Sequence, residues 1–390
     1  MNYRALAVHS TRAVYAINWY NISPALIYIE SDLFLNQAQV GLLVTAFYIG
    51  VGVSQIPAGY LATIIGNRNM ASSGIFLLGI SGLVSSISPG LTLLIVSRAM
   101  AGIASGMFFS PAMGTLRNIT DDRTYGFHVN VFNGVFSLGA GAGLAGWAIL
   151  DITVGWRIAF LLSGLITISF SLIYYFSLRR VHEERPARSP SNIMKSVLTN
   201  RVVWILGMAG SAAIISENVA AAFIVYYLEE ALGILPSPAA LAGTLILAFG
   251  FAGGIVGGLV AGRYISTRLF FYLTTVAVSM LMISIAFIRS IVEIYVIVSL
   301  IGMLTAPIIS SSYVLITGSL KGREEITSSM SVVNGVQQIP GSVWPYAFTL
   351  IVSFFSFGAA WVFIGVSSLA LLALGFLPSV RKMPLNEQVG

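Results

Sequence analysis

Two ionisable side chains lie deep inside long apolar stretches of this 390-residue chain. Glu217 is the only acid well within such a stretch, and Arg98 is the clearest base. A charge placed inside a membrane costs about 2.5–3.5 kcal/mol on insertion scales, so it usually faces a cavity or a partner. We expect Glu217 to couple protons or bind a substrate cation, with a structural helix contact or a place near the outer mouth as the alternatives. We expect Arg98 to couple protons, anchor the structure or clamp an anion bidentately.

Uncharged polar side chains recur on single faces of several apolar stretches. Spacing of i, i+3 places Tyr15, Asn18 and Asn21 on one helix face. The other candidate substrate contacts are Gln55, Asn133, Asn334, Gln337 and Gln338. Because an unpaired amide is costly in lipid, these faces should point inwards, either towards a substrate or as hydrogen bonds between helices. His9 and Arg12 begin the first stretch, and we expect them to be anchors at the membrane interface.

The composition excludes most soluble proteins. Hydrophobic residues make up 57% of the chain and charged residues 9%, whereas a soluble domain carries about 25% charged residues. With no cysteine, disulfides, zinc–thiolate sites and a catalytic thiol are excluded. We expect no metal and no cofactor, because the glycine-rich runs lack the strand and the G-K-[ST] of a nucleotide loop, and no metalloprotease or Ser-His pattern occurs in the spans. An enzyme is therefore not expected.

Twelve stretches are long enough to cross a bilayer as helices, which takes roughly 20 apolar residues each. Period-2 alternation is absent, which argues against membrane strands. The predicted spans are Ala13–Ile29, Val40–Ala62, Met70–Ile87, Leu91–Met113, Phe132–Ile149, Ile158–Ser177, Val202–Leu228, Leu241–Gly262, Leu269–Phe287, Ile294–Ile316, Val332–Phe354 and Ala359–Leu377.

The basic residues predict the orientation of these spans. If the N-terminus is cytoplasmic, the outer loops hold only Arg157 and Arg289, and nearly all other Lys and Arg lie inside. Cytoplasmic loops carry such an excess, so we expect a protein of the cell membrane with both termini in the cytoplasm. The net charge of +6 is thus a topology signal, and we expect no nucleic-acid partner.

An internal repeat divides the chain into two parallel copies. Phe132-Asn133-Gly134-Val135 reappears as Val333-Asn334-Gly335-Val336, a shift of about 200 residues, or six spans. An even number of spans gives both copies the same orientation, as in one known transporter plan. We predict an all-α membrane protein with a six-helix bundle over residues 1–178, a cytoplasmic linker over 179–200 and a second six-helix bundle over 201–390. For Asn133 and Asn334 the repeat favours gating or helix contacts over substrate binding.

The chain resembles the major facilitator superfamily over essentially its whole length, and three motifs carry this resemblance. The segment from Gly59 to Arg68, with Gly66, resembles the G-x-L-A-D-R-x-G-R-K loop, although Thr63 stands in place of its Asp. The second copy retains Gly258 and Arg263. Arg98-Ala-Met-Ala-Gly102-Ile-Ala-Ser-Gly106 resembles the R-x-x-x-G-x-x-x-G signature of span four, and Gly155-Trp156-Arg157 resembles the entry to span six.

The resemblance implies a secondary transporter that works by alternating access. The loop motifs would act in gating, and spans one, four, seven and ten would line a central cavity. We expect proton-coupled symport of a small organic solute, which Arg98 would allow to be an anion. The competing interpretation is a proton-driven efflux pump for drugs or metabolites. The expected partners are the lipid bilayer, the solute and protons, and the chain is expected to be a monomer.

Overall fold

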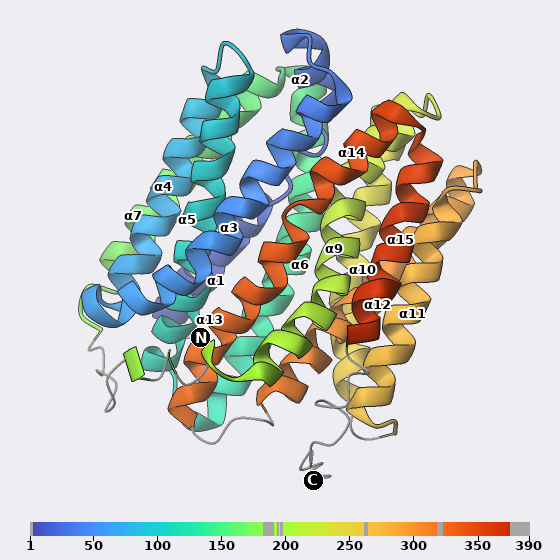
Figure 1. The fold of residues 1–390 in the computed structure, drawn as a ribbon. Coiled ribbons are helices and arrows are strands. Elements are labelled where there is room, and N and C mark those ends of the chain that lie inside the picture. Colours follow the sequence, from blue (N-terminus) through green and yellow to red (C-terminus); the bar gives the residue numbers. More distant parts are fainter. Residues whose placement is uncertain are drawn as a thin grey trace.

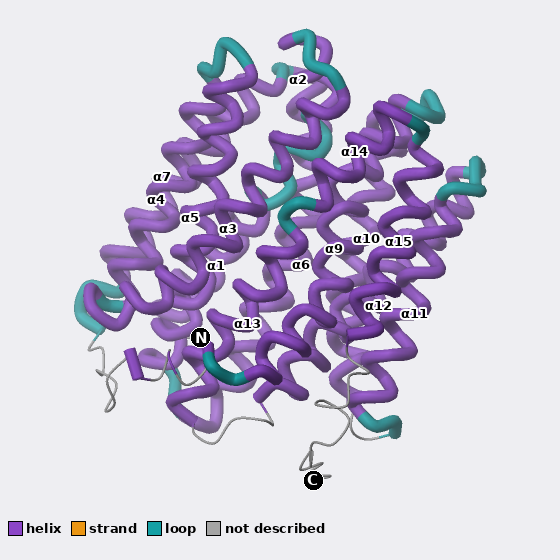
Figure 2. Tube along the Cα trace, in the orientation of Figure 1, coloured by secondary structure: helices purple, strands orange, loops and turns teal. Residues whose placement is uncertain are grey.

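The computed structural model describes residues 3–181, 191–192, 195, 198–260, 264–317 and 323–374. These residues form helices joined by short loops, and no strand occurs among them (Figure 2). The helices of the first half are α1 (Tyr3–Ile17), α2 (Leu26–Leu33), α3 (Gln37–Ile65), α4 (Asn67–Ser86), α5 (Leu91–Ile119), α6 (Asp122–Thr153) and α7 (Trp156–Ser177). The helices of the second half are α9 (Arg201–Glu230), α10 (Pro236–Val260), α11 (Thr267–Ile285), α12 (Ile291–Thr317), α13 (Arg323–Gly341), α14 (Trp344–Phe354) and α15 (Phe357–Leu374).

The helices stand side by side as a bundle, with the two halves next to each other (Figure 1). Within the described residues, nine helices are individually long and apolar enough to cross a membrane, and α15 is a shorter apolar helix. The other two predicted spans are each made of two helices in succession, α1 with α2 and α13 with α14. Much of the predicted linker lies outside the described residues.

The first and eleventh spans are therefore broken, where the sequence predicts continuous helices. Turns replace helix between Asn18 and Ala25, because Pro24 has no N–H to donate and because the Asn18 amide bonds back to the Val14 carbonyl at 2.7 Å. In the eleventh span Pro345 lies in the first turn of α14, a position that suits proline.

The motif residues set where several helices begin. Gly66 and Gly155 have φ angles of +92° and +83° and directly precede α4 and α7. A side chain would be strained in that conformation, which explains glycine at both sites. Asn36 begins α3 with a reciprocal capping box, since its side chain accepts from the Gln39 N–H and its own N–H donates to the Gln39 amide.

Close helix crossings repeat in the two halves. A side chain at Gly102 of α5 would collide with the Phe47 carbonyl of α3, and one at Gly302 of α12 would collide with the Ile246 carbonyl of α10. Small residues allow such approach between membrane helices. The glycines of the span-four signature thus hold α3 and α5 together, and the second half uses the same device.

The two halves touch along α3 of the first half and α13–α14 of the second. The Tyr346 N–H donates to Thr45 Oγ1 at 2.9 Å. Further along α3, Gly52 packs on Ile339 and Gly59 on Ser331. Contact therefore extends over most of the length of α3.

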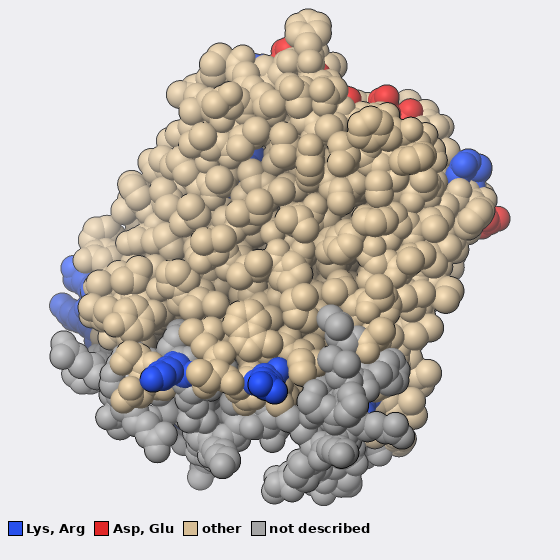
Figure 3. Space-filling model, viewed as in Figure 1, with Lys and Arg blue, Asp and Glu red and all other residues tan. Residues whose placement is uncertain are grey.

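The charges separate to the two ends of the bundle. We call the end that carries Arg68, Arg179 and Arg180 the basic end, and the end that carries Glu30 and Glu230 the acidic end. On the face in Figure 3, most Lys and Arg lie along the lower edge and most Asp and Glu along the upper edge, with a broad uncharged band between them. Such a band is what a lipid-embedded surface requires.

Candidate substrate and proton site

Arg98 lies one helical turn before Gly102 in α5, and its side chain is only 2% exposed. Its Nη1 donates to Asn21 Oδ1 at 3.3 Å, and the guanidinium carbon lies 4.8 Å from the ring centre of Phe47. The Nε group has no hydrogen-bond partner. Within the described part of the chain no carboxylate forms an ion pair with Arg98, so no acidic side chain described there neutralises its charge.

The broken part of the first span supports Arg98. Asn18 donates to Thr167 Oγ1 at 2.9 Å and accepts from the Ser163 hydroxyl, both on α7. Asn21 in turn lies within 3.5 Å of Asn18 Oδ1. Asn18 thus joins the break to α7 within the first half, whereas Asn21 holds the arginine in place.

Glu217 lies in the middle of α9, which is otherwise deeply buried. It retains partial accessibility, while every other residue from Ala209 to Leu228 is buried. Among the described residues its carboxylate makes no hydrogen bond and no ion pair. Because an unpartnered carboxylate in a span is costly when ionised, Glu217 is suited to carry a proton there.

Two tyrosines of the first half experience the electrostatic field of Glu217. Tyr20, in the break, and Tyr48, on α3, both lie within electrostatic range of its carboxylate. Tyr48 lies within range of Arg98 as well. The same phenol is therefore within electrostatic range of the acid of the second half and of the cation of the first.

The amides predicted on the eleventh span mostly serve the second half. Gln337 Nε2 donates to Ser312 Oγ on α12 at 2.8 Å, and Gln338 Oε1 accepts from Asn218 Nδ2 at 3.3 Å. Asn334 is 9% exposed and has an interaction partner. Gln337 therefore forms a hydrogen bond between α13 and α12, whereas Gln338 bonds to Asn218, the residue that follows Glu217.

Gln55 and Asn133 have opposite environments. Gln55 is 1% exposed, its Oε1 has no partner, and it packs near Gly335 of the second half. A substrate contact by Asn133 stays a prediction, because its side chain is exposed on α6 and is therefore not packed between helices. The adjacent residues are packed instead, since Phe132 is buried and Gly134 packs on Phe251.

Arg12 and His9 were expected at the membrane interface, and that expectation is wrong. Each is 4% exposed. His9 stacks on His128 of α6 and shares a 3.0 Å hydrogen bond with it. Arg12 lies beneath Tyr15, the first of the predicted substrate contacts, at 4.7 Å from its ring centre. Arg12, Tyr15 and Asn18 follow i, i+3 spacing, and this pattern could have identified the buried arginine.

The loop motif of the first half is built into the basic end. Arg68 Nη1 donates to the Arg179 carbonyl at 2.8 Å and stacks on Tyr175, which connects the start of α4 to the end of α7. Gly59 is the residue of the motif that touches the second half, through Ser331. Of the second copy, Gly258 lies in α10 and Arg263 lies outside the described residues.

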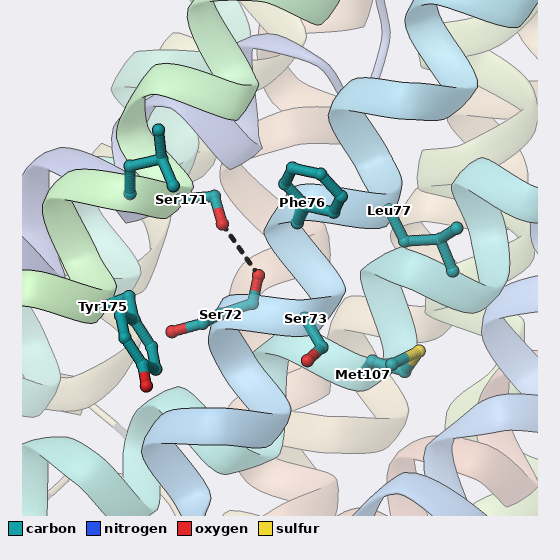
Figure 4. Close-up of a pocket in the computed structure, with 8 residues that line it drawn as sticks. Ser72, Ser73, Phe76, Leu77, Met107, Ser171 and Tyr175 are labelled. Atoms are coloured by element: carbon teal, nitrogen blue, oxygen red, sulfur yellow. Dashed lines mark hydrogen bonds between the residues drawn. The ribbon is translucent and has the colours of Figure 1, made fainter.

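Two cavities lie away from Arg98 and Glu217. One, of about 440 Å³, opens between α4, α5 and α7 and is lined by Phe76, Leu77 and several hydroxyls (Figure 4). It contains no charged residue. The other, of about 340 Å³, lies at the acidic end, where Arg157 pairs with Asp32 and Trp156 donates to the same carboxylate. That motif therefore joins α7 to the end of α2.

Comparison with known proteins decides the family. A sequence model described as "Major Facilitator Superfamily" matches residues 9–345. The chain belongs to the Major Facilitator Superfamily. A crystal structure titled as a bacterial homologue of the human lysosomal transporter Spinster, inward-facing and occupied, covers 98% of this chain and 97% of its own, with a TM-score of 0.81 at 16% identity. The predicted fold class, two parallel sets of six membrane helices, is thereby confirmed.

Curated relatives in the superfamily share parts of the chain. A probable L-galactonate transporter of Escherichia coli is 23% identical over 62% of this chain and 57% of its own length. The 4-hydroxybenzoate transporter PcaK of Pseudomonas aeruginosa is 27% identical over 40% of this chain and 34% of its own. The chain thus spans about a third to three fifths of these relatives. It is a multi-pass membrane protein of a transporter family.

Proposed function

We propose that this protein is a secondary active transporter that moves a small organic anion together with a proton by alternating access. The observation that carries the proposal is the opposed pair of ionisable groups, in which Arg98 of α5 and Glu217 of α9 each lack an ion-pair partner among the described residues. Arg98 would bind the anionic group of the solute, and Glu217 would take up the proton.

The two proposed sites lie in different halves of the chain, Arg98 on α5 and Glu217 on α9. Tyr48 lies within electrostatic range of both, so filling one site changes the field at the other. A proton on Glu217 removes an unpaired charge from the interior, and an anion on Arg98 compensates another. Loading both ligands leaves the net charge of the protein unchanged for a monovalent anion, and it lowers the electrostatic cost of rearranging the halves.

The names of the relatives support an organic anion as the solute, since galactonate and 4-hydroxybenzoate are both carboxylates. The charge separation between the ends supports an orientation with the basic end and both termini in the cytoplasm, in the cell membrane. We propose that one chain suffices, since both sites lie within it.

Transport by purified protein in proteoliposomes tests the proposal, with radiolabelled galactonate and 4-hydroxybenzoate as the solutes. Glu217→Gln should abolish accumulation driven by a pH gradient and leave counterflow exchange, because a neutral amide cannot release a proton. Glu293→Gln, at an exposed acid at the start of α12, is the matched control and should behave as wild type. Gradient-driven uptake by Glu217→Gln at the wild-type level would refute proton coupling through this residue.

Arg98→Lys tests the anion site in the same assay. Lysine keeps the charge and loses the two-pronged geometry, so the apparent affinity for the carboxylate should fall about tenfold or more, as expected for a charge-assisted bidentate contact. Wild-type affinity in this variant would remove Arg98 from solute binding.

One observation favours efflux of hydrophobic compounds as a second candidate. Trp19, Phe47 and Tyr48 pack in mutual contact beside Arg98, so a ligand that reached Arg98 would meet buried aromatic rings. The test is pH-driven transport of a hydrophobic cation such as ethidium in the same proteoliposomes. If the protein transports ethidium and does not transport the carboxylates, efflux replaces anion transport as the proposed function.

A further inference from the structure

A second buried cation lies in the first half, closer to the basic end than Arg98. Arg12 of α1 is 4% exposed, and its Nε and Nη1 groups have no hydrogen-bond partner. No ion pair to Arg12 occurs among the residues that the structure describes. A buried N–H group without an acceptor is rare and costly, so these two N–H groups lack the acceptors that a bound anion would supply.

Aromatic rings from three helices surround the Arg12 guanidinium. Its central carbon lies 4.5 Å from the ring centres of Phe132 and Phe136 on α6, 5.0 Å from Phe109 on α5 and 4.7 Å from Tyr15 on α1. The π faces attract the cation, but they are much weaker hydrogen-bond acceptors for its N–H groups than a carboxylate oxygen would be. Phe109 and Phe136 are partly accessible, so these two rings border the side on which the enclosure is least complete.

The rings connect the two buried arginines. Tyr15 lies 5.3 Å from Trp19, Trp19 lies 5.0 Å from Phe47, and Phe47 lies beneath Arg98. Aromatic ring pairs favour separations of this size. A continuous series of ring contacts therefore joins one cation to the other.

We infer that Arg12 is a second anion-binding residue and that its aromatic surroundings select carboxylates with a flat aromatic body. The carboxylate accepts from the unpartnered N–H groups of Arg12, while the aromatic body displaces Phe109 or Phe136 and stacks on the remaining rings. This inference rests on the proposed transport of organic anions, and it adds a residue and a solute class that the resemblance to the superfamily does not supply.

Three small probes separate the charge from the ring. Benzoate has both, benzamide has the ring without the charge, and cyclohexanecarboxylate has the charge without the aromatic ring. Binding to purified wild-type protein is measured by titration calorimetry at pH 7. We expect benzoate to bind at least tenfold more tightly than either of the other two probes, because only benzoate satisfies both the guanidinium and the rings.

Variants then assign the binding to this place. Arg12→Gln should weaken benzoate at least tenfold and leave benzamide within twofold. Phe136→Leu should lower the affinity for benzoate and leave the affinity for cyclohexanecarboxylate within twofold of wild type. Arg117→Gln, at the basic end of α5, is the control for a lost arginine. Thermal unfolding checks that each variant is folded, and Arg12→Lys replaces Arg12→Gln if the latter does not fold, with the same expected loss for benzoate.

The outcomes distinguish this inference from the proposed function. If Arg12→Gln binds benzoate like wild type while Arg98→Lys does not, Arg12 is not a binding residue and the transport proposal stands. If cyclohexanecarboxylate binds the wild type as tightly as benzoate, the aromatic selectivity is wrong. If neither arginine variant changes the binding of any carboxylate, the anion proposal fails as well.

Discussion

In the first half, α5 carries Arg98 one turn before Gly102, whereas at the equivalent place in the second half α12 carries Val298 before Gly302. Both glycines allow a close crossing with a neighbouring helix, and both Arg98 and Val298 are buried. The packing is thus repeated between the halves and the ionisable group is not. The two halves therefore share contacts that hold helices together and differ in the chemistry that each can perform.

The same contrast appears in the first span of each half. The first half breaks this span into α1 and α2, whereas α9 runs without interruption from Arg201 to Glu230. The break carries Asn21 and Tyr20, and the continuous helix carries Glu217. Interrupted helices often form transporter binding sites, because they free polar groups in the interior. The solute contacts should therefore lie mainly in the first half and the proton site in the second.

Exchanging the residue types between the halves should produce the largest effect. Val298→Arg would place an unpaired charge at a fully buried site, and we expect the free energy of unfolding to fall by about 3 kcal/mol or more. Arg98→Leu removes such a charge, so its stability should stay within about 1 kcal/mol of wild type or rise. Thermal unfolding of both purified variants measures this. A well-folded, stable Val298→Arg would mean that the second half also has room for a cation.

Ser23→Ala should have a medium effect, on the closure between the halves. Ser23 Oγ lies 2.8 Å from the carbonyls of both Ala221 and Ala222 on α9, and its loss should cost about 1 kcal/mol. The chain has no cysteine, so a single Asn218→Cys reporter can be labelled selectively with a membrane-impermeant maleimide. Ser23→Ala should raise its labelling rate from the acidic end severalfold.

Ser216→Ala is the matched control for this experiment. The Ser216 hydroxyl is buried as well, but it bonds the Ala212 carbonyl and lies near Ser368 within the second half. We expect no change in labelling of the reporter. Equal labelling rates in the two serine variants would show that the Ser23 contact does not hold the halves together.

The smallest effect should come from the acidic end, where each half uses an arginine differently. Arg157 pairs with Asp32, and both side chains are about two-fifths exposed, whereas Arg289 donates to the neutral Tyr227 hydroxyl at 3.1 Å. Exposed ion pairs contribute about 0–1 kcal/mol. Asp32→Asn and Tyr227→Phe should therefore each lower the free energy of unfolding by less than about 1 kcal/mol in thermal melts, and the Asp32 effect alone should shrink in high salt. A loss of several kcal/mol in the free energy of unfolding for Asp32→Asn would show that this ion pair is a major contact between α2 and α7.

The sequence was sufficient to predict the fold, because span length and hydropathy depend on local composition alone. The twelve spans and their repeat follow from apolar runs of the required length. The breaks in the first and eleventh spans were not predicted. Their cause is partly tertiary: the Asn18 side chain bonds to α7, and no pattern within the span itself reveals that partner.

The site was predicted less completely than the fold. Arg98 and Glu217 could be predicted as candidates because a lone charge in an apolar run is conspicuous, and their roles stay predictions. Arg12 was assigned to the interface because it lies near the start of its run, and distance from the end of a run does not measure burial in a bundle. The exposure of the Asn133 side chain was not predicted, because hydropathy cannot tell which face of α6 packs against neighbours.

The Ser23 hydrogen bonds depend on the side chain at position 23 but not on the side chains at positions 221 and 222. Their acceptors are backbone carbonyls of α9, which every amino acid at positions 221 and 222 would supply as long as the helix persists. Their donor is a side chain, which only a residue with a suitable hydroxyl could provide. In a library of random variants, substitutions that open this end should therefore accumulate at position 23, while positions 221 and 222 should tolerate small residues freely.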